Sequence, residues 1–198
     1  MAELAIVYGS RLGQTYKIST RIAGRLRANG HRVSVLDVHS SPAPRLLASQ
    51  HGVIIGSSVR GERHLPEIRR LVQEHAELLR RVPSAFFSVS LAERSPRNSA
   101  RGSLGYVPRF LHQVGWRPRL TAVFGGAMPY SRFSWLGKRL MRSVWREQGI
   151  SLDITRDHQY TRWPDVDGFA EAFDDLLRES HLPSIIVARE LGVPAAGY

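Results

Sequence analysis

Short apolar runs alternate with amphipathic stretches along this 198-residue chain, and no other sequence feature limits its fold as much. Continuous apolar runs are typical of strands buried on both faces of a sheet, whereas apolar residues three and four positions apart are typical of helices. The pattern predicts strands at Leu4–Tyr8, Arg32–Val38, Gly52–Ser57, Ala85–Leu91 and Leu120–Phe124. It predicts helices at Thr15–Asn29, Leu65–Arg81, Tyr106–Val114 and Asp165–Arg178.

Strands that alternate with helices predict an α/β fold, a parallel sheet with helices on both faces, because crossover connections are right-handed. Two segments depart from this plan: a polar loop at Ala92–Gly105 and an insertion at 128–155, after the fifth strand. The length suits one domain. We expect that domain to span 1–180, followed by a C-terminal tail over 181–198.

The first predicted strand runs into Ser10-Arg11-Leu12-Gly13-Gln14-Thr15, where a helix starts at once. The first turn of a helix has free N–H groups and favours negative charge. Ser10 and Thr15 add hydroxyl donors, and Gly13 allows close backbone approach. Neither the lysine of a triphosphate loop nor the dinucleotide glycine fingerprint is found. The loop therefore predicts a phosphate monoester site, with an ordinary capped helix as the alternative.

Two further small-residue loops follow the third and fourth predicted strands, Gly56–Gly61 and Ser88–Ala92. Ligands of open α/β sheets bind beyond the carboxyl ends of the strands, so the three loops are expected to converge there. Their backbone amides suit the edge of a flat ring, whose faces Val59 and Leu91 would cover.

With these loops in place, the chain resembles the flavodoxin family, whose FMN-phosphate motif matches Ser10-x-x-Gly13-x-Thr15. The resemblance implies a flavodoxin-like three-layer sandwich, a five-stranded parallel sheet of order 2-1-3-4-5 with an insertion after strand five, and FMN as cofactor. The three loops assign FMN binding to Ser10, Arg11, Leu12, Gly13, Gln14, Thr15, Ser57, Ser58, Val59, Arg60, Ser88, Val89, Ser90 and Leu91.

A more detailed resemblance runs from about Leu4 to about Phe173, to the bacterial menaquinone-dependent protoporphyrinogen IX dehydrogenases. It is carried by Ser10–Thr15, Ile55–Arg60, Pro83–Leu91, Trp116–Pro118, Gly125–Met128, Tyr130–Trp135 and Tyr160–Trp163. It implies oxidation of protoporphyrinogen IX in haem biosynthesis, with menaquinone or ubiquinone as acceptor and FMN itself carrying the chemistry. It also implies peripheral association with the cytoplasmic side of the inner membrane. The chain departs from that family in its longer tail and its arginine-rich composition.

The net charge of the chain and the sequence of the 128–155 insertion indicate what the protein could bind. Lys and Arg total 28 against 17 Asp and Glu, a net charge of +11, which attracts polyanions or simply aids solubility. Phe133–Trp145 interleaves aromatic and cationic residues, which suits an anionic membrane surface. A lid over an anionic substrate and an ordinary surface helix are the alternatives. Since no recognition motif is found, nucleic acid is not an expected partner.

Arginines near the loops are candidates for the two propionates of such a substrate, because arginine makes forked bonds to carboxylates. These are Arg60, Arg63, Arg94 and Arg132, with solvated surface charge as the alternative. No cysteine is present and no histidine spacing suits a metal, so no metal site is expected. An NAD(P)H:quinone reductase and a one-electron carrier flavodoxin are the rival functions, although carriers of that kind are typically acidic.

Overall fold

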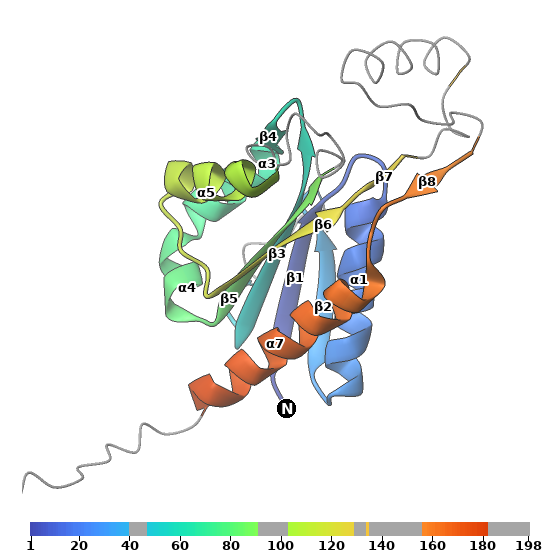
Figure 1. Ribbon diagram of the computed structural model, residues 1–198. Coiled ribbons are helices and arrows are strands. Elements are labelled where there is room, and N and C mark those ends of the chain that lie inside the picture. The colour runs from blue at the N-terminus through green and yellow to red at the C-terminus, as the bar shows by residue number, and fades with distance from the viewer. Residues whose placement is uncertain (40–46, 91–102, 129–133, 135–155, 182–198) are drawn as a thin grey trace, which may run out of the picture.

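The computed structural model describes residues 1–39, 47–90, 103–128, 134 and 156–181. Parallel strands follow the order β2-β1-β3-β5-β6 across the main sheet (Figure 1). They are β1 (Glu3–Gly9), β2 (Arg32–Asp37), β3 (Gly52–Arg60), β5 (Ser84–Ser90) and β6 (Leu120–Gly125). The predicted order of the five parallel strands is confirmed.

Helices cover both faces of the sheet (Figure 1). One face carries α1 (Gln14–Ala28) and α7 (Trp163–His181), and the other carries α3 (Pro66–Glu74), α4 (Ala76–Arg81) and α5 (Ser103–Val114). Successive strand residues point to opposite faces. Leu4 and Ile6 accordingly pack in the core under α1 and α7, whereas Ala5 and Val7 pack in the core under α3 and α5.

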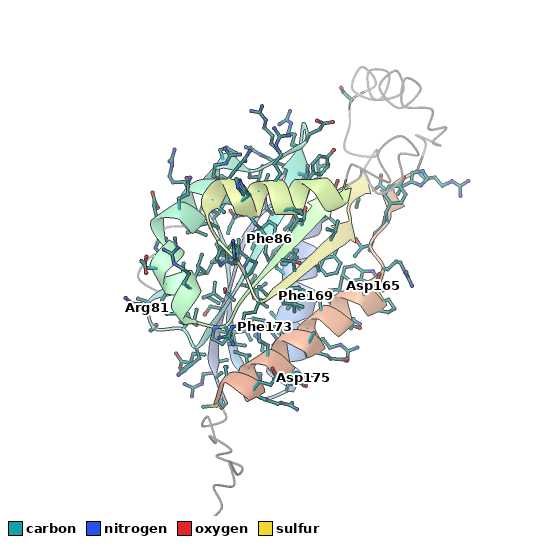
Figure 2. All side chains as sticks on the ribbon, turned by 60° about the vertical axis from the view of Figure 1, so that its left-hand side comes forward. Arg81, Phe86, Asp165, Phe169, Phe173 and Asp175 are labelled. Carbon is teal, nitrogen blue, oxygen red and sulfur yellow. The ribbon has the colours of Figure 1, made fainter. Side chains whose placement is uncertain are left out.

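Aromatic side chains fill both layers between sheet and helices. Figure 2 shows Phe169 and Phe173 on the side of α7 that faces the sheet, and both are buried. In the opposite layer the buried ring of Phe86 stacks on Phe110 of α5, with 5.0 Å between centroids. Side chains of this size each stabilise the fold by roughly 2–3 kcal/mol through burial.

The helix predicted over Leu65–Arg81 is two helices, α3 and α4, that divide at His75. The backbone of His75 leaves the helical region, with φ −114° and ψ 20°. Its ring Nδ1 and its backbone N–H both bond the carbonyl oxygen of Leu71, at 3.0 and 3.1 Å. This local side-chain bond stabilises the end of a helix that periodicity alone extends.

The third strand continues past its predicted end at Ser57 and turns back on itself. Gly61 and Glu62 have φ values of 53° and 62°, which is the left-handed pair of a two-residue hairpin. The chain returns as β4 (Arg63–His64), antiparallel to β3, so that six strands rather than five form the sheet. The hairpin has no clear sequence signal, because a non-glycine residue such as Glu62 rarely occupies this conformation.

The insertion after β6 leaves and rejoins the fold through a second, small sheet. Its strands are β7 (Ala127–Met128) and β8 (His158–Gln159), which pair antiparallel and were not predicted. Leu91, Arg94 and Arg132, the amphipathic stretch 133–145 apart from residue 134, and the tail 182–198 lie outside the described residues. Among the helices that are described, none combines the length and apolarity needed to cross a membrane.

Candidate functional site

The loop between β1 and α1 has the geometry of an anion site. Gly13 caps the helix with φ 87°, a left-handed conformation that favours glycine, and its N–H donates to Ser10 Oγ at 3.0 Å. The first helical hydrogen bond runs from Lys17 N to Gly13 O, so the amides before Lys17 have no partner inside the helix. No acidic residue lies in this first turn.

Two buried hydroxyls near the carboxyl ends of the strands lack hydrogen-bond partners among the described residues. They are Oγ1 of Thr15, whose side chain is 1% exposed, and Oγ of Ser58. A buried donor without a partner costs about 1–3 kcal/mol, so a ligand that supplies the missing partner at either hydroxyl gains that energy. Thr15 lies in the first turn of α1, where an anion is most favoured.

The predicted convergence of the three loops is confirmed by the register of the strands. Gly9 pairs with Ser57, and Ser57 pairs with Ser88. The last residue of β1 therefore lies level with Ser57 and Ser88 at the carboxyl end of the sheet, and β3 continues past this level to Arg60 (Figure 1). A ligand that contacts the β1–α1 loop is within reach of backbone from all three strands.

The hydroxyls of Ser57 and Ser88, both fully buried, hold the β4 hairpin. Ser57 Oγ accepts from Leu65 N at 3.3 Å and donates to Ser58 O. Ser88 Oγ lies 2.9 Å from Nε2 of His64. The hydroxyls of these two serines are therefore used within the protein, and the hairpin that they hold lies beside the ends of β1 and β5.

His64 is the titratable group most affected by the fold. Burial, followed by the charge of Arg69, lowers the pKa of His64 to about 4. An unfolded histidine takes up its proton near pH 6.5. Between these pH values the unfolded state binds more protons, so the free energy of unfolding falls as the pH falls.

We expect this effect to cost about 1–2 kcal/mol of stability at pH 5 relative to pH 7. Urea unfolding at pH 5 and pH 7 measures this loss. The difference in the free energy of unfolding between the two pH values should be smaller in His64→Gln, which keeps a polar partner for Ser88. His39→Gln, at an exposed histidine, is the matched control and should leave the difference unchanged. An unchanged difference in His64→Gln would refute the assignment.

A hydrogen-bonded bridge joins the anion loop to the base of the insertion. Gln14 Nε2 donates to Thr161 Oγ1 at 2.8 Å, and Thr161 Oγ1 donates to Gly125 O at 2.6 Å. The predicted role of Gln14 in cofactor binding is thus limited to its backbone, because its side chain is only 4% exposed and bonds Thr161. Thr161 lies in the Tyr160–Trp163 segment that carries the family resemblance, but a contact between two residues 147 positions apart has no local sequence signal.

The predicted arginines divide into two described and two undescribed positions. Arg60 and Arg63 are exposed and pair across the β3–β4 register. Arg11 of the anion loop lies 3.5 Å from Glu67 of α3 and is half exposed, so this pair adds little to stability. Arginine side chains are thus present near the carboxyl ends of the strands, where they are available to an acidic ligand.

Taken together, these groups fit FMN. Free first-turn amides, the unpartnered hydroxyl of Thr15 and the absence of a triphosphate lysine in the loop suit one phosphate monoester. The row of strand ends suits the edge of the flavin ring. A groove of about 650 Å³ is lined by Tyr16, Gly24 and Trp163 of α1 and α7 and by none of the residues predicted to bind FMN.

Comparison with known proteins agrees with this geometry. A family model described as a flavodoxin domain matches residues 5–154. Protoporphyrinogen IX dehydrogenase (quinone) of Escherichia coli K12 is 32% identical over 165 residues, which are 83% of this chain and 91% of that protein. The protein of the same name from Leishmania major is 31% identical over 169 residues, 85% of this chain and 73% of that protein.

The fold comparison gives the same assignment. A flavodoxin from the domain Archaea superposes with a TM-score of 0.52 at 12% identity, over 89% of this chain and 99% of that one. The chain therefore belongs to the flavodoxin-domain family, as an FMN-binding oxidoreductase related to the protoporphyrinogen IX dehydrogenases of the quinone type.

Proposed function

We propose that this chain oxidises protoporphyrinogen IX to protoporphyrin IX in haem biosynthesis, with menaquinone or ubiquinone as the electron acceptor. The observation that carries the proposal is the 32% identity to the Escherichia coli dehydrogenase over 91% of that protein. The match is not confined to the anion loop, which all flavodoxin-type sites need. The net charge of +11 also favours an acidic substrate.

The residues of the chain bind and orient the cofactor and the substrate, because FMN supplies the electron chemistry when it is bound. First-turn amides of α1 and the Thr15 hydroxyl hold the phosphate. Backbone at Ser57–Arg60 and Ser88–Ser90 would hold the ring edge, and the β3–β4 hairpin would cover one side of it. No described side chain at this edge is assigned as a general base.

Cationic residues beside the ring edge bind the acid groups of the substrate in this proposal. Arg60 and Arg63 lie on the hairpin, and Arg94 and Arg132 complete the predicted set from outside the described residues. Arginine binds propionate through two parallel N–H donors, which fixes orientation as well as charge.

Anaerobic mixing tests the proposal. FMN-loaded protein is combined with protoporphyrinogen IX, with and without a menaquinone analogue, and porphyrin fluorescence is followed. Each FMN accepts two electrons and full oxidation of the substrate removes six, so without quinone the porphyrin formed should stay below about one third of an equivalent per FMN. With quinone present we expect porphyrin fluorescence to grow far beyond that limit. Absence of growth with FMN bound would contradict the proposal. Quinone reduction by NAD(P)H in the same preparation would then assign a reductase, and its absence would favour an electron carrier.

We further propose that the chain associates peripherally with an anionic membrane surface on its cytoplasmic side, where quinone is available. The charge of +11 and the pattern of 133–145 support this. In vesicle sedimentation we expect at least tenfold stronger binding to anionic than to zwitterionic vesicles, decreasing with salt. Equal partition to both vesicle types would contradict the proposal.

A further inference from the structure

A small polar cavity is lined by residues of the β3–β4 hairpin, α3 and α5. These elements lie together on the α3–α5 side of the sheet (Figure 1). Its volume is about 180 Å³. Complete small-molecule sites usually measure roughly 300–1,000 Å³, so this cavity has room for one end group of a larger molecule. None of its lining residues comes from the β1–α1 loop, which makes it distinct from the phosphate site.

Positive charge dominates its lining. Arg63, Arg69 and Arg109 face Glu62 as the single acidic residue. His64 adds no charge at neutral pH, because burial lowers its pKa to about 4. The cavity therefore carries a surplus of guanidinium charge, and no ion pair of the described residues involves any of these three arginines.

Arg69 contributes a donor that no described residue uses. Its terminal nitrogen donates to Gln113 Oε1 at 3.1 Å, which fixes the guanidinium between α3 and α5. Its Nε is buried and has no hydrogen-bond partner among the described residues. An oriented and partly desolvated guanidinium with a free N–H binds a planar oxyanion more strongly than a freely moving surface arginine does.

The buried wall of the cavity is aromatic. The rings of His64 and Phe110 lie 4.7 Å apart, and both side chains are buried. Tyr106 lines the cavity as well, and burial followed by the charge of Glu62 raises its pKa, so its hydroxyl keeps its proton as a donor. An apolar wall beside arginine donors suits an aliphatic acid, with methylenes on the rings and oxygens on the guanidinium groups.

We propose that this cavity binds one carboxylate group of a larger ligand, with Arg69 and Arg109 as its principal donors. The hairpin that forms one wall also carries the ring-edge backbone, so the rest of that ligand would reach toward the flavin site. That the carboxylate is a propionate of protoporphyrinogen IX rests on the proposed function. Arg69, Arg109 and Tyr106 are then specificity residues that the strand-end loops did not indicate.

Titration with sodium propionate tests the cavity without any turnover. Amide signals of Arg63, Tyr106 and Arg109 in ¹⁵N–¹H spectra of the FMN-loaded protein should shift with a millimolar dissociation constant. Arg69→Gln and Arg109→Gln should each raise this constant at least fivefold. Arg119→Gln, at an exposed arginine that directly precedes β6 at the other end of the sheet, is the matched control and should not change it.

Substrate kinetics supply the second arm. The KM for protoporphyrinogen IX should rise at least fivefold in Arg69→Gln and Arg109→Gln, with kcat and FMN affinity unchanged. A merely structural role would lower kcat or release FMN instead. Mesoporphyrin IX should compete with the substrate, and its dimethyl ester should compete at least fivefold less well, because the ester has lost its charge.

The propionate titration and the substrate kinetics together distinguish failure of the cavity proposal from failure of the proposed function. Propionate binding without porphyrinogen oxidation would sustain the cavity and overturn the activity. Oxidation with an unchanged KM in both variants, and no propionate shifts, would overturn the cavity and leave the activity. Binding of inorganic phosphate but not of propionate would overturn the assignment to a carboxylate.

Discussion

Gly125→Ala is expected to lower the free energy of unfolding by about 3 kcal/mol. A Cβ at this position would lie 2.4 Å from the carbonyl oxygen of Tyr160 and 2.8 Å from its carbonyl carbon. These are backbone atoms, so a rotamer change cannot remove the overlap. The strand end must separate from the segment that carries Tyr160, which also disturbs the bond from Thr161 to Gly125 O.

Gly24→Ala is the matched control for this change. The same methyl group at Gly24, inside α1, meets no atom within 4 Å. Because alanine favours the helix over glycine, this variant should gain about 0.5–1 kcal/mol. Urea unfolding of both apo variants measures the two effects. Equal stability of Gly125→Ala and the parent chain would show that β6 and Tyr160 separate without cost.

Thr15→Val should act in opposite directions on the apo protein and on FMN binding. It replaces an unpartnered buried hydroxyl by a methyl group of similar size. The apo protein should gain about 1 kcal/mol, because the unsatisfied polar group is gone. FMN should bind about thirtyfold more weakly, since a hydrogen bond to a charged phosphate is worth about 2 kcal/mol.

Urea unfolding without FMN measures the stability of the apo protein, and quenching of FMN fluorescence measures the affinity for FMN. Thr15→Ser restores the hydroxyl and should recover most of the affinity. Thr20→Val makes the same replacement at an exposed position one turn further along α1, and should change neither quantity by more than about 0.5 kcal/mol. A stable Thr15→Val variant with full FMN affinity would remove Thr15 from the phosphate site.

The sheet and the anion loop could be predicted because their signals are local. Buried parallel strands appear as unbroken apolar runs, such as Val53-Ile54-Ile55, all fully buried. The glycine of the anion loop marks a left-handed turn between a strand and a helix, and Gly13 has φ 87°. Strand order then follows from the flavodoxin resemblance and agrees with the observed register.

The parts that were missed depend on contacts distant in sequence. The β4 hairpin is held by His64 on Ser88 and by Leu65 on Ser57, which no periodicity records. Gln14 matched a cofactor motif, yet its amide bonds Thr161. Arg69 and Arg109 lie on helices, with no neighbours in sequence that suggest a ligand, and only the packing of α3 against α5 places them around one cavity.

The β7–β8 pair has a consequence for how this family can change length. Ala127 pairs with Gln159, so the chain leaves and rejoins the fold at nearly the same point. The hydrogen bond from Thr161 Oγ1 to Gly125 O joins the two ends of the segment a second time. Because closing a loop costs only about 0.6 kcal/mol more for each doubling of its length, the enclosed segment is free to grow, shrink or be exchanged. The main sheet stays the same when this segment changes, so evolution can vary the length and sequence of the insertion without altering the fold around the FMN site.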